Sequence, residues 1–308
     1  MNKLIFNIKK ILKPVLRKIS NKKIRGVFIN INDQFNKHTY NSKVILKYFD
    51  QFNLKEIDPE KLEVINFLRN NKINLFPYDF IKKYNSSDIK IFDGENGLKY
   101  GLSNNKKIFF KRSCSENEAQ QILSALNLEQ DNESPHRYLN DDFTVDENDI
   151  VLDIGAAEGY FSLLIVEKVN KIYIFESNPE LIEALNTTFE PWKYKVFIVN
   201  KYVSNKSDEI FTTIDDFFKD KEPPTFLKVD IEGAEYDFIQ GAKKLLSTKN
   251  QMKIILAAYH KHNDEIILNE ELKKYGFKTN FSKGYMLSIW DGVIKEPYLR
   301  RALIRAQK

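Results

Sequence analysis

The stretch from Val151 to Gly159, V-L-D-I-G-A-A-E-G, decides the fold of this chain. An apolar run that ends in an acidic residue and two glycines predicts a buried strand and a tight turn, and the helical pattern 160–167 follows at once. A strand that turns through glycine into a helix presents bare backbone beside the positive end of the helix. The stretch therefore predicts a ligand site at the carboxyl end of this strand.

The spacing of the glycines distinguishes two kinds of nucleotide site. A dinucleotide fingerprint reads G-x-G-x-x-G, whereas three residues separate Gly155 from Gly159 here and Asp153 precedes the first glycine. This pattern is typical of sites for S-adenosylmethionine (SAM). The missing G-x-G argues against an NAD-dependent oxidoreductase.

Composition and charge narrow the class of protein. With 308 residues, 42% hydrophobic and 30% charged, the chain reads as a globular protein. A single cysteine, Cys114, excludes an internal disulfide framework and fits a reducing compartment such as the cytoplasm. We interpret it as an inert thiol. Residues 1–26 hold nine basic side chains and no acid, which leaves 39 basic and 43 acidic residues, a net charge of −4, in the rest. A broad nucleic-acid-binding face is therefore not expected.

Residues 1–26 carry apolar side chains at helical spacing opposite the lysines and arginines. No run is long enough to span a bilayer, and no signal-peptide cleavage site follows. Two interpretations stand: a basic amphipathic helix at the inner face of the membrane, or a terminal helix packed on the domain. Pro14 would kink a single long helix.

Residues 27–144 form a predicted α+β accessory region on the substrate side. Asp58-Pro59 reads as the start of a helix that reaches Asn70. Short apolar runs at 89–92, 98–102 and 107–111 predict a small meander. Ser115 and Glu118 have the spacing of a capping box, which predicts a helix to about residue 130.

From residue 145 to 308 apolar runs alternate with helical patterns. Strands are predicted at 151–154, 171–175, 194–203, 226–229 and 253–259, and helices at 160–167, 181–189, 214–218, 236–246 and 264–275. This alternation predicts a doubly wound α/β sheet. The runs 277–282 and 285–290, with two residues between them, predict a tight antiparallel hairpin. A mostly parallel sheet that closes in a hairpin is the Rossmann-like layout of class I methyltransferases.

Ligands of such sheets bind beyond the carboxyl ends of the strands, and ionisable residues gather there. Glu176, about twenty residues beyond the glycine turn, is placed to accept hydrogen bonds from both ribose hydroxyls, or else caps the next helix. Asp230 follows the fourth strand, and its neighbours Lys228 and Glu232 stay undecided between function and an ion pair that fixes the turn. His260 follows the fifth strand and is a candidate general base, or a structural histidine.

Several ordered motifs carry a family resemblance. They are L-D-I-G-A-A-E-G-Y-F-S, I-F-E-S-N-P, T-I-D-D-F, L-K-V-D-I-E-G-A-E and A-Y-H-K, with Gly241-Ala242 after the fourth, between about residues 145 and 265. Together they resemble the FkbM family of SAM-dependent methyltransferases. The resemblance implies methyl transfer from SAM to a hydroxyl, often on a sugar or polyketide-like acceptor. The family often has Asn-Ile at Ala157-Glu158 and Pro at Ser177, so these positions depart from it.

The roles that follow are hypotheses. The methionine end of SAM is held by Asp153 and the turn Gly155, Ala156 and Gly159, and the ribose by Glu176 with Ser177 and Asn178 beside it. Asp230 and His260 flank the methyl group, and His260 takes the hydroxyl proton. His262 is a weaker candidate for the base. No metal is assigned, although Asp230, Glu232 and Asp264 would serve in a version assisted by Mg²⁺.

Two questions about function stay open at this point. A SAM-binding or scaffold protein of a glycan-assembly complex, without catalysis, is the second class of function. The acceptor, a small molecule or glycan, is not identified. His136 and Arg137, ahead of the glycine strand, either meet an anionic or sugar group of the acceptor or belong to a linker.

Overall fold

A computed structural model of the chain describes residues 42–53, 55–248, 251–287 and 296–308, all of which lie in one compact unit, residues 41–308. The predicted amphipathic segment 1–26 lies outside the described residues. Among the helices that are described, none is long and apolar enough to cross a membrane.

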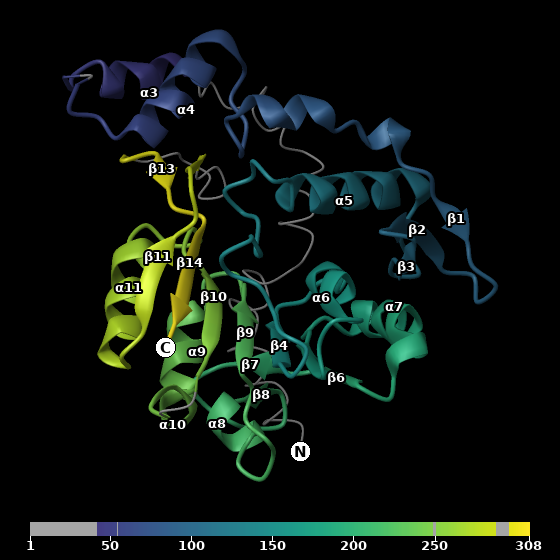
Figure 1. Cartoon of the computed structure of the whole chain (residues 1–308). Coiled ribbons are helices and arrows are strands. Elements are labelled where there is room, and N and C mark those ends of the chain that lie inside the picture. The colour runs from purple at the N-terminus through teal and green to yellow at the C-terminus, as the bar shows by residue number, and fades with distance from the viewer. Residues whose placement is uncertain (1–41, 54, 249–250, 288–295) are drawn as a thin grey trace, which may run out of the picture. The chain divides into compact units, whose positions relative to one another are not determined.

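Within the described residues, a seven-stranded sheet forms the centre of the fold (Figure 1). Its order is β11-β14-β10-β9-β4-β5-β6, and β14 runs antiparallel to both of its neighbours while the other pairings are parallel. This order and this single reversed strand confirm the predicted class I methyltransferase layout. The strands are β4 (Ile150–Ile154), β5 (Lys171–Phe175), β6 (Val196–Val199), β9 (Phe226–Val229), β10 (Lys253–Ala257), β11 (Lys278–Phe281) and β14 (Leu303–Gln307).

Helices cover both faces of the sheet, as a doubly wound fold requires (Figure 1). On one face lie α8 (Ile214–Phe217), α9 (Glu235–Gly241), α10 (Lys243–Leu246) and α11 (Asp264–Lys274), and on the other α6 (Tyr160–Ile165) and α7 (Pro179–Phe189). Alternate residues of the strands, such as Leu152, Leu227 and Leu256, are fully buried against the first set of helices. Asp153, which lies between such residues on β4, contacts Ser162 of α6.

Two predicted elements are each divided in the structure. The predicted strand 194–203 is β6 and a separate β7 (Tyr202–Val203), which pairs in parallel with β8 (Phe211–Thr212). The chain leaves the large sheet at Asn200, whose side-chain amide donates to the carbonyl of Glu176 (2.8 Å). The predicted helix 236–246 is α9 and α10, separated at Ala242, whose backbone (φ −121°, ψ 19°) is not helical.

The predicted two-residue hairpin after residue 277 is wrong. The first predicted strand contains β11, which pairs with β14 and not with residues 285–287. Residues 288–290 of the second predicted strand lie outside the described residues. The connection instead carries β12 (Met286–Leu287) and β13 (Leu299–Arg300), which pair with each other. The chain turns away because Tyr285 donates its hydroxyl to Asp58 (2.7 Å), and Arg301 forms ion pairs with Asp58 and Glu60.

The accessory region is α+β, as predicted. It contains α3 (Ser42–Phe49), α4 (Pro59–Asn70), the 3₁₀ turns η1 (Asp79–Lys83) and η2 (Ser86–Asp88), the antiparallel strands β1 (Phe92–Asp93), β2 (Lys99–Ser103) and β3 (Lys106–Phe109), and α5 (Glu116–Glu129). Asp58 caps α4, and Ser115 with Glu118 forms the predicted capping box. The region is attached to α7, where Arg112 pairs with Glu183.

The glycine turn yields a prediction about stability. Gly155 has φ +75°, and a Cβ there would lie 1.9 Å from the carbonyl oxygen of Asp230, whereas Gly276 has φ +83° with nothing within 4 Å. Gly276→Ala should cost about 1 kcal/mol from backbone strain alone. Gly155→Ala should cost about 3 kcal/mol or more, because a backbone collision adds to the same strain. Thermal unfolding of the two variants measures the difference, and equal losses would contradict the contact with Asp230.

Candidate active site

The glycine turn joins β4 to α6 at the carboxyl edge of the sheet. Gly155, Ala157 and Gly159 have φ of +75°, +51° and +76°, and Gly159 is the N-cap of α6. The close approach to Asp230 explains why position 155 is glycine. The turn thus brings the end of β9 against the end of β4, and this contact builds the site.

A buried ion pair lies beneath the turn. Asp153 and Lys228 are direct partners in the register of β4 and β9, and the Lys228 ammonium lies 3.1 Å from the Asp153 carboxylate. Ser162 donates its hydroxyl to Asp153 (2.7 Å), and Lys228 donates to the carbonyl of Gly155 (2.8 Å). Burial opposes the charge on Lys228, but Asp153 and Asp230 outweigh it and raise the pKa of Lys228. Asp153 has no exposed surface, so its carboxylate supports the turn from below.

Glu176 bridges the glycine turn and the start of α7. Its carboxylate accepts hydrogen bonds from the backbone N–H groups of Ala157 (2.9 Å) and Asn178 (2.7 Å). Asn178, not Glu176, is the N-cap of α7, because its side chain accepts from Glu180 N–H (3.1 Å). Glu176 therefore lies at the glycine turn, and Ser177 lies between Glu176 and Asn178 in the chain.

Asp230 lies at the centre of a buried polar cluster. Tyr138 donates its hydroxyl to Asp230 (2.8 Å), as does Tyr259 (3.1 Å), and the Nε2 atom of His136 lies 3.3 Å from the carboxylate. Burial opposes ionisation of Asp230. The hydrogen bond from His136 and the charges of His260 and Lys228 outweigh burial and hold the pKa of Asp230 well below its usual range. Asp230 is therefore an anion at neutral pH.

His260 lies between carboxylates on the other side of Asp230. Its Nδ1 atom is 2.8 Å from Glu235, and its Nε2 atom is 3.5 Å from Asp230 and 3.6 Å from Glu232. Burial favours the neutral ring, but the charge and hydrogen bond of Glu235 outweigh it and raise the pKa of His260 to about 10. The ring is then an imidazolium at neutral pH, which cannot accept a proton until it loses one.

Glu232 occupies the outer edge of the cluster. Its backbone has φ +59°, an unusual conformation for glutamate, and its side chain is 52% exposed. Partial burial, opposed by the charge of His260 and reinforced by Asp230 and Glu235, raises the pKa of Glu232 to about 7. Backbone strain of this kind is concentrated at functional sites. Glu232 is thus a reachable carboxylate that changes its protonation near neutral pH.

The structure brings together most of the predicted residues and adds others. His136, which the sequence placed either at the acceptor or in a linker, is buried against Asp230. Tyr138, Tyr259 and Glu235 were not predicted to act in the site, although Tyr138 follows the His-Arg pair and Tyr259 directly precedes His260. His262 is exposed.

Of the residues considered for a metal, Asp230, Glu232 and Asp264, only Asp230 belongs to a group of side chains that could share a cation. Ligand atoms of Asp230, Glu235 and His260 lie within 4.8 Å of one another, close enough to share a cation. Glu232 reaches this group only through His260, and Asp264 instead accepts from the backbone N–H of Lys261 (2.6 Å). Within this group His260 lies at hydrogen-bond distance from Glu235, at 2.8 Å.

A model of a known protein family matches part of this chain. Residues 204–279 match the family model of the methyltransferase FkbM domain, so the chain resembles that family there, as the sequence motifs predicted. No curated protein sequence shows a significant match.

Three solved structures with a similar fold are distant in sequence. The methyltransferase FkbM from Methylobacillus flagellatus KT is 14% identical (TM-score 0.43), and the match covers 63% of this chain and 56% of that one. TYW2 from M. jannaschii, in complex with AdoMet, is 16% identical (TM-score 0.40; 71% and 89% covered). The precorrin-6y C5,15-methyltransferase from Geobacter metallireducens GS-15 is 15% identical (TM-score 0.38; 53% and 83% covered). At these values the likenesses identify neither the reaction nor the acceptor of this chain.

The charge on His260 can be tested by NMR, because the chain contains only four histidines. In histidine-labelled protein we expect His260 to stay protonated through neutral pH and to titrate near pH 10. Glu235→Gln should lower this pKa, because it removes the negative charge that stabilises the protonated ring most. Glu167→Gln, at an exposed position, is the control and should leave the pKa of His260 unchanged. Since the pKa is 6.5 in the absence of these contacts, their contribution to stability is complete below that pH and is lost as the pH rises toward 10. Titration of His260 near 6.5 would contradict the ion pair.

Proposed function

We propose that this chain is a SAM-dependent methyltransferase, on the premise that residues 204–279 match the methyltransferase FkbM domain. The observation that carries the proposal is the position of Glu176 beside the glycine turn, at the carboxyl ends of two adjacent parallel strands. In doubly wound sheets a nucleoside binds at this edge, with a carboxylate on its ribose.

The residues at the turn fit such a cofactor. Gly155 and Gly159 give a turn with no side chain over it, Ala156 lies between them, and Glu176 presents a carboxylate beside it. Asp153 contributes from below by holding Lys228 against the carbonyl of Gly155. SAM supplies a methyl group already activated by its sulfonium. What the chain must add is the orientation of the acceptor and a place for its proton.

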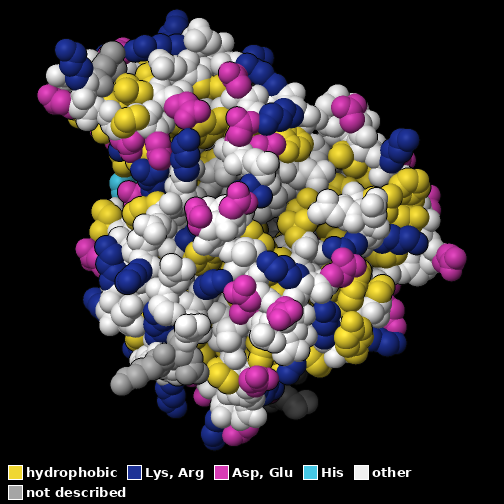
Figure 2. All heavy atoms as spheres, in the orientation of Figure 1, with side chains coloured by type: hydrophobic (Ala, Val, Ile, Leu, Met, Phe, Trp, Pro, Cys, Tyr) yellow, Lys and Arg dark blue, Asp and Glu magenta, His cyan; other side chains and the backbone are white. Residues whose placement is uncertain are grey.

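The acceptor in this proposal is the hydroxyl of a sugar or glycan, and the reaction is O-methylation. Acidic and basic side chains are interspersed on the face in Figure 2, and the chain after residue 26 is slightly acidic, which favours a small-molecule or glycan acceptor over nucleic acid. The lone buried thiol of Cys114 suits the cytoplasm. Contact of residues 1–26 with the inner face of the membrane belongs to the same proposal.

Glu232 is the better candidate for the proton acceptor than His260. A general base works best when its pKa lies near the operating pH and the reacting group can reach it. Glu232 meets both conditions, with a pKa of about 7 and a half-exposed side chain. His260, with a pKa of about 10, stabilises the carboxylates of Asp230 and Glu232 as a cation. In this proposal Glu232, and not His260, takes the hydroxyl proton.

A SAM-binding scaffold without catalysis is the competing function. Calorimetry with SAM separates a binder from a non-binder, and transfer of a labelled methyl group separates an enzyme from a binder. The unusual protonation of Glu232 and His260 favours the enzyme, since groups with shifted pKa values are concentrated at catalytic sites.

The cofactor assignment predicts the effect of one substitution. Glu176→Gln should raise the dissociation constant for SAM about tenfold or more, because a charge-assisted hydrogen bond contributes about 1.5–3 kcal/mol. Glu190→Gln, an exposed glutamate after α7, is the matched control and should leave binding unchanged. Calorimetry measures both, and equal affinities for SAM in the two variants would remove Glu176 from the site.

The base assignment predicts a pH profile. With the fastest acceptor from a panel of sugars, the rate should rise with pH through about 7 as Glu232 loses its proton. Glu232→Gln should abolish this rise, whereas His260→Asn should lower the rate and keep the rise. Loss of the rise in the His260 variant, with retention in the Glu232 variant, would assign the base to His260 instead.

A further inference from the structure

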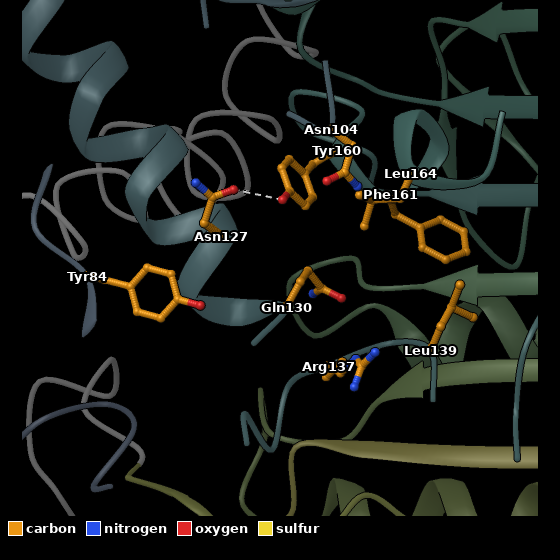
Figure 3. A pocket seen from close by; sticks show the side chains of 9 residues that line it. All are labelled: Tyr84, Asn104, Asn127, Gln130, Arg137, Leu139, Tyr160, Phe161 and Leu164. Carbon is orange, nitrogen blue, oxygen red and sulfur yellow. Dashed lines mark hydrogen bonds between the residues drawn. The ribbon is translucent and has the colours of Figure 1, made fainter. Parts of the chain in front are cut away.

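A pocket lies beside the first turn of α6, on the side of the accessory region. Its volume is about 480 Å³, within the size range of small-molecule sites. The lining combines aromatic side chains, Tyr84, Tyr160 and Phe161, with the amides Asn127 and Gln130 and with Arg137 (Figure 3). Tyr160 and Phe161, which directly follow the glycine turn in the chain, both line this pocket.

The lining chemistry suits a sugar with a negative charge. Amides donate to and accept from hydroxyl groups, and the faces of aromatic rings pack against the C–H faces of a sugar ring. Part of the lining is already fixed, because Tyr160 donates its hydroxyl to Asn127 (2.8 Å), as Figure 3 shows. None of the residues that line the pocket is acidic, and Arg137 is the cation among them.

Arg137 is held by its backbone while its side chain has no carboxylate partner among the described residues. Arg305 donates to the carbonyls of Arg137 (2.6 Å) and Tyr138 (3.3 Å). Gln130 accepts from Tyr138 N–H (3.0 Å) and donates to the carbonyl of His136 (3.4 Å). Burial lowers the pKa of Arg305, and the positive charge of Arg137 lowers it further, so the two guanidinium groups repel each other. An anionic ligand would relieve this repulsion.

The pocket and the Asp230 cluster are built from the same short segment. His136 and Tyr138 contact Asp230, while Arg137 between them lines the pocket. Phe161 lines the pocket and also packs edge-on against the ring of Tyr138, with centroids 5.5 Å apart. The segment 136–138 therefore contributes to both the pocket and the Asp230 cluster.

We propose that this pocket binds an anionic sugar unit of the methyl acceptor, with the Arg137 guanidinium on its carboxylate or phosphate. The inference rests on the proposed function, since it names the acceptor of that same site. A planar guanidinium suits both anions, because it forms paired hydrogen bonds to either. The amide nitrogen of Asn127 then faces a sugar hydroxyl, and the aromatic residues face the ring.

Calorimetry on the full chain tests this with three probes: glucuronate, glucose 1-phosphate and glucose. We expect at least one anionic sugar to bind at millimolar concentration, and glucose to bind at least about tenfold more weakly. Arg137→Gln should weaken the binding of the anionic sugar by a similar factor, and Arg137→Lys should retain part of the affinity. The matched control is Arg69→Gln, which removes the same charge from an exposed position on α4 and should change nothing. The two anionic probes distinguish a carboxylate acceptor from a phosphate acceptor.

SAM binding, measured on the same samples, separates the two levels of the proposal. Arg137→Gln should bind SAM as the unchanged chain does, which also shows that the variant is folded. If neither anionic sugar binds to a chain that binds SAM, or if Arg137→Gln binds it equally well, the pocket assignment is overturned and the proposed function stands. If the unchanged chain fails to bind SAM, the proposed function itself fails.

Discussion

The buried ion pair between Asp153 and Lys228 is the interaction on which the site depends. Both residues are direct neighbours in the register of β4 and β9, and neither side chain is more than 4% exposed. Removing one partner of such a pair leaves an uncompensated buried charge and costs about 3–5 kcal/mol. The ammonium also binds the carbonyl of Gly155, so it fixes the start of the glycine turn. The position of Asp230 follows, because its carbonyl lies against Gly155.

The accessory region completes the site from the other side. His136 and Tyr138 come from the segment between α5 and β4, and both contact Asp230. Glu129, at the end of α5, lies near His136, and burial raises its pKa to about 7. The polar cluster therefore exists only where the two regions meet. Its residues are buried because the accessory region covers this edge of the sheet.

The ionisable groups of the cluster differ in their pKa values. Asp230 stays ionised, Glu232 titrates near pH 7, and His260 keeps its proton to about pH 10. The cause in each case is position: Asp230 is surrounded by donors, Glu235 is 2.8 Å from His260, and Glu232 is at the margin. Neighbouring groups whose pKa values are pushed apart are a common basis of acid–base catalysis.

The sequence by itself determined the elements whose signals are local. The strand, turn and helix at 150–165, the capping box at Ser115 and the order of strands and helices follow from short-range patterns of apolar residues, glycines and caps. Glu176, Asp230 and His260 were found for the same reason, since the carboxyl ends of parallel strands meet at one edge. Only the tertiary structure decided which distant segments pair. β11 pairs with β14 and not with its nearest segment along the chain, where Gly284, Tyr285 and Arg301 instead bind Asp58 and Glu60. Tyr138 likewise contacts Asp230 from 92 residues away. The protonation of His260 was decided in the same way, because it depends on the distance to Glu235, which no local pattern encodes.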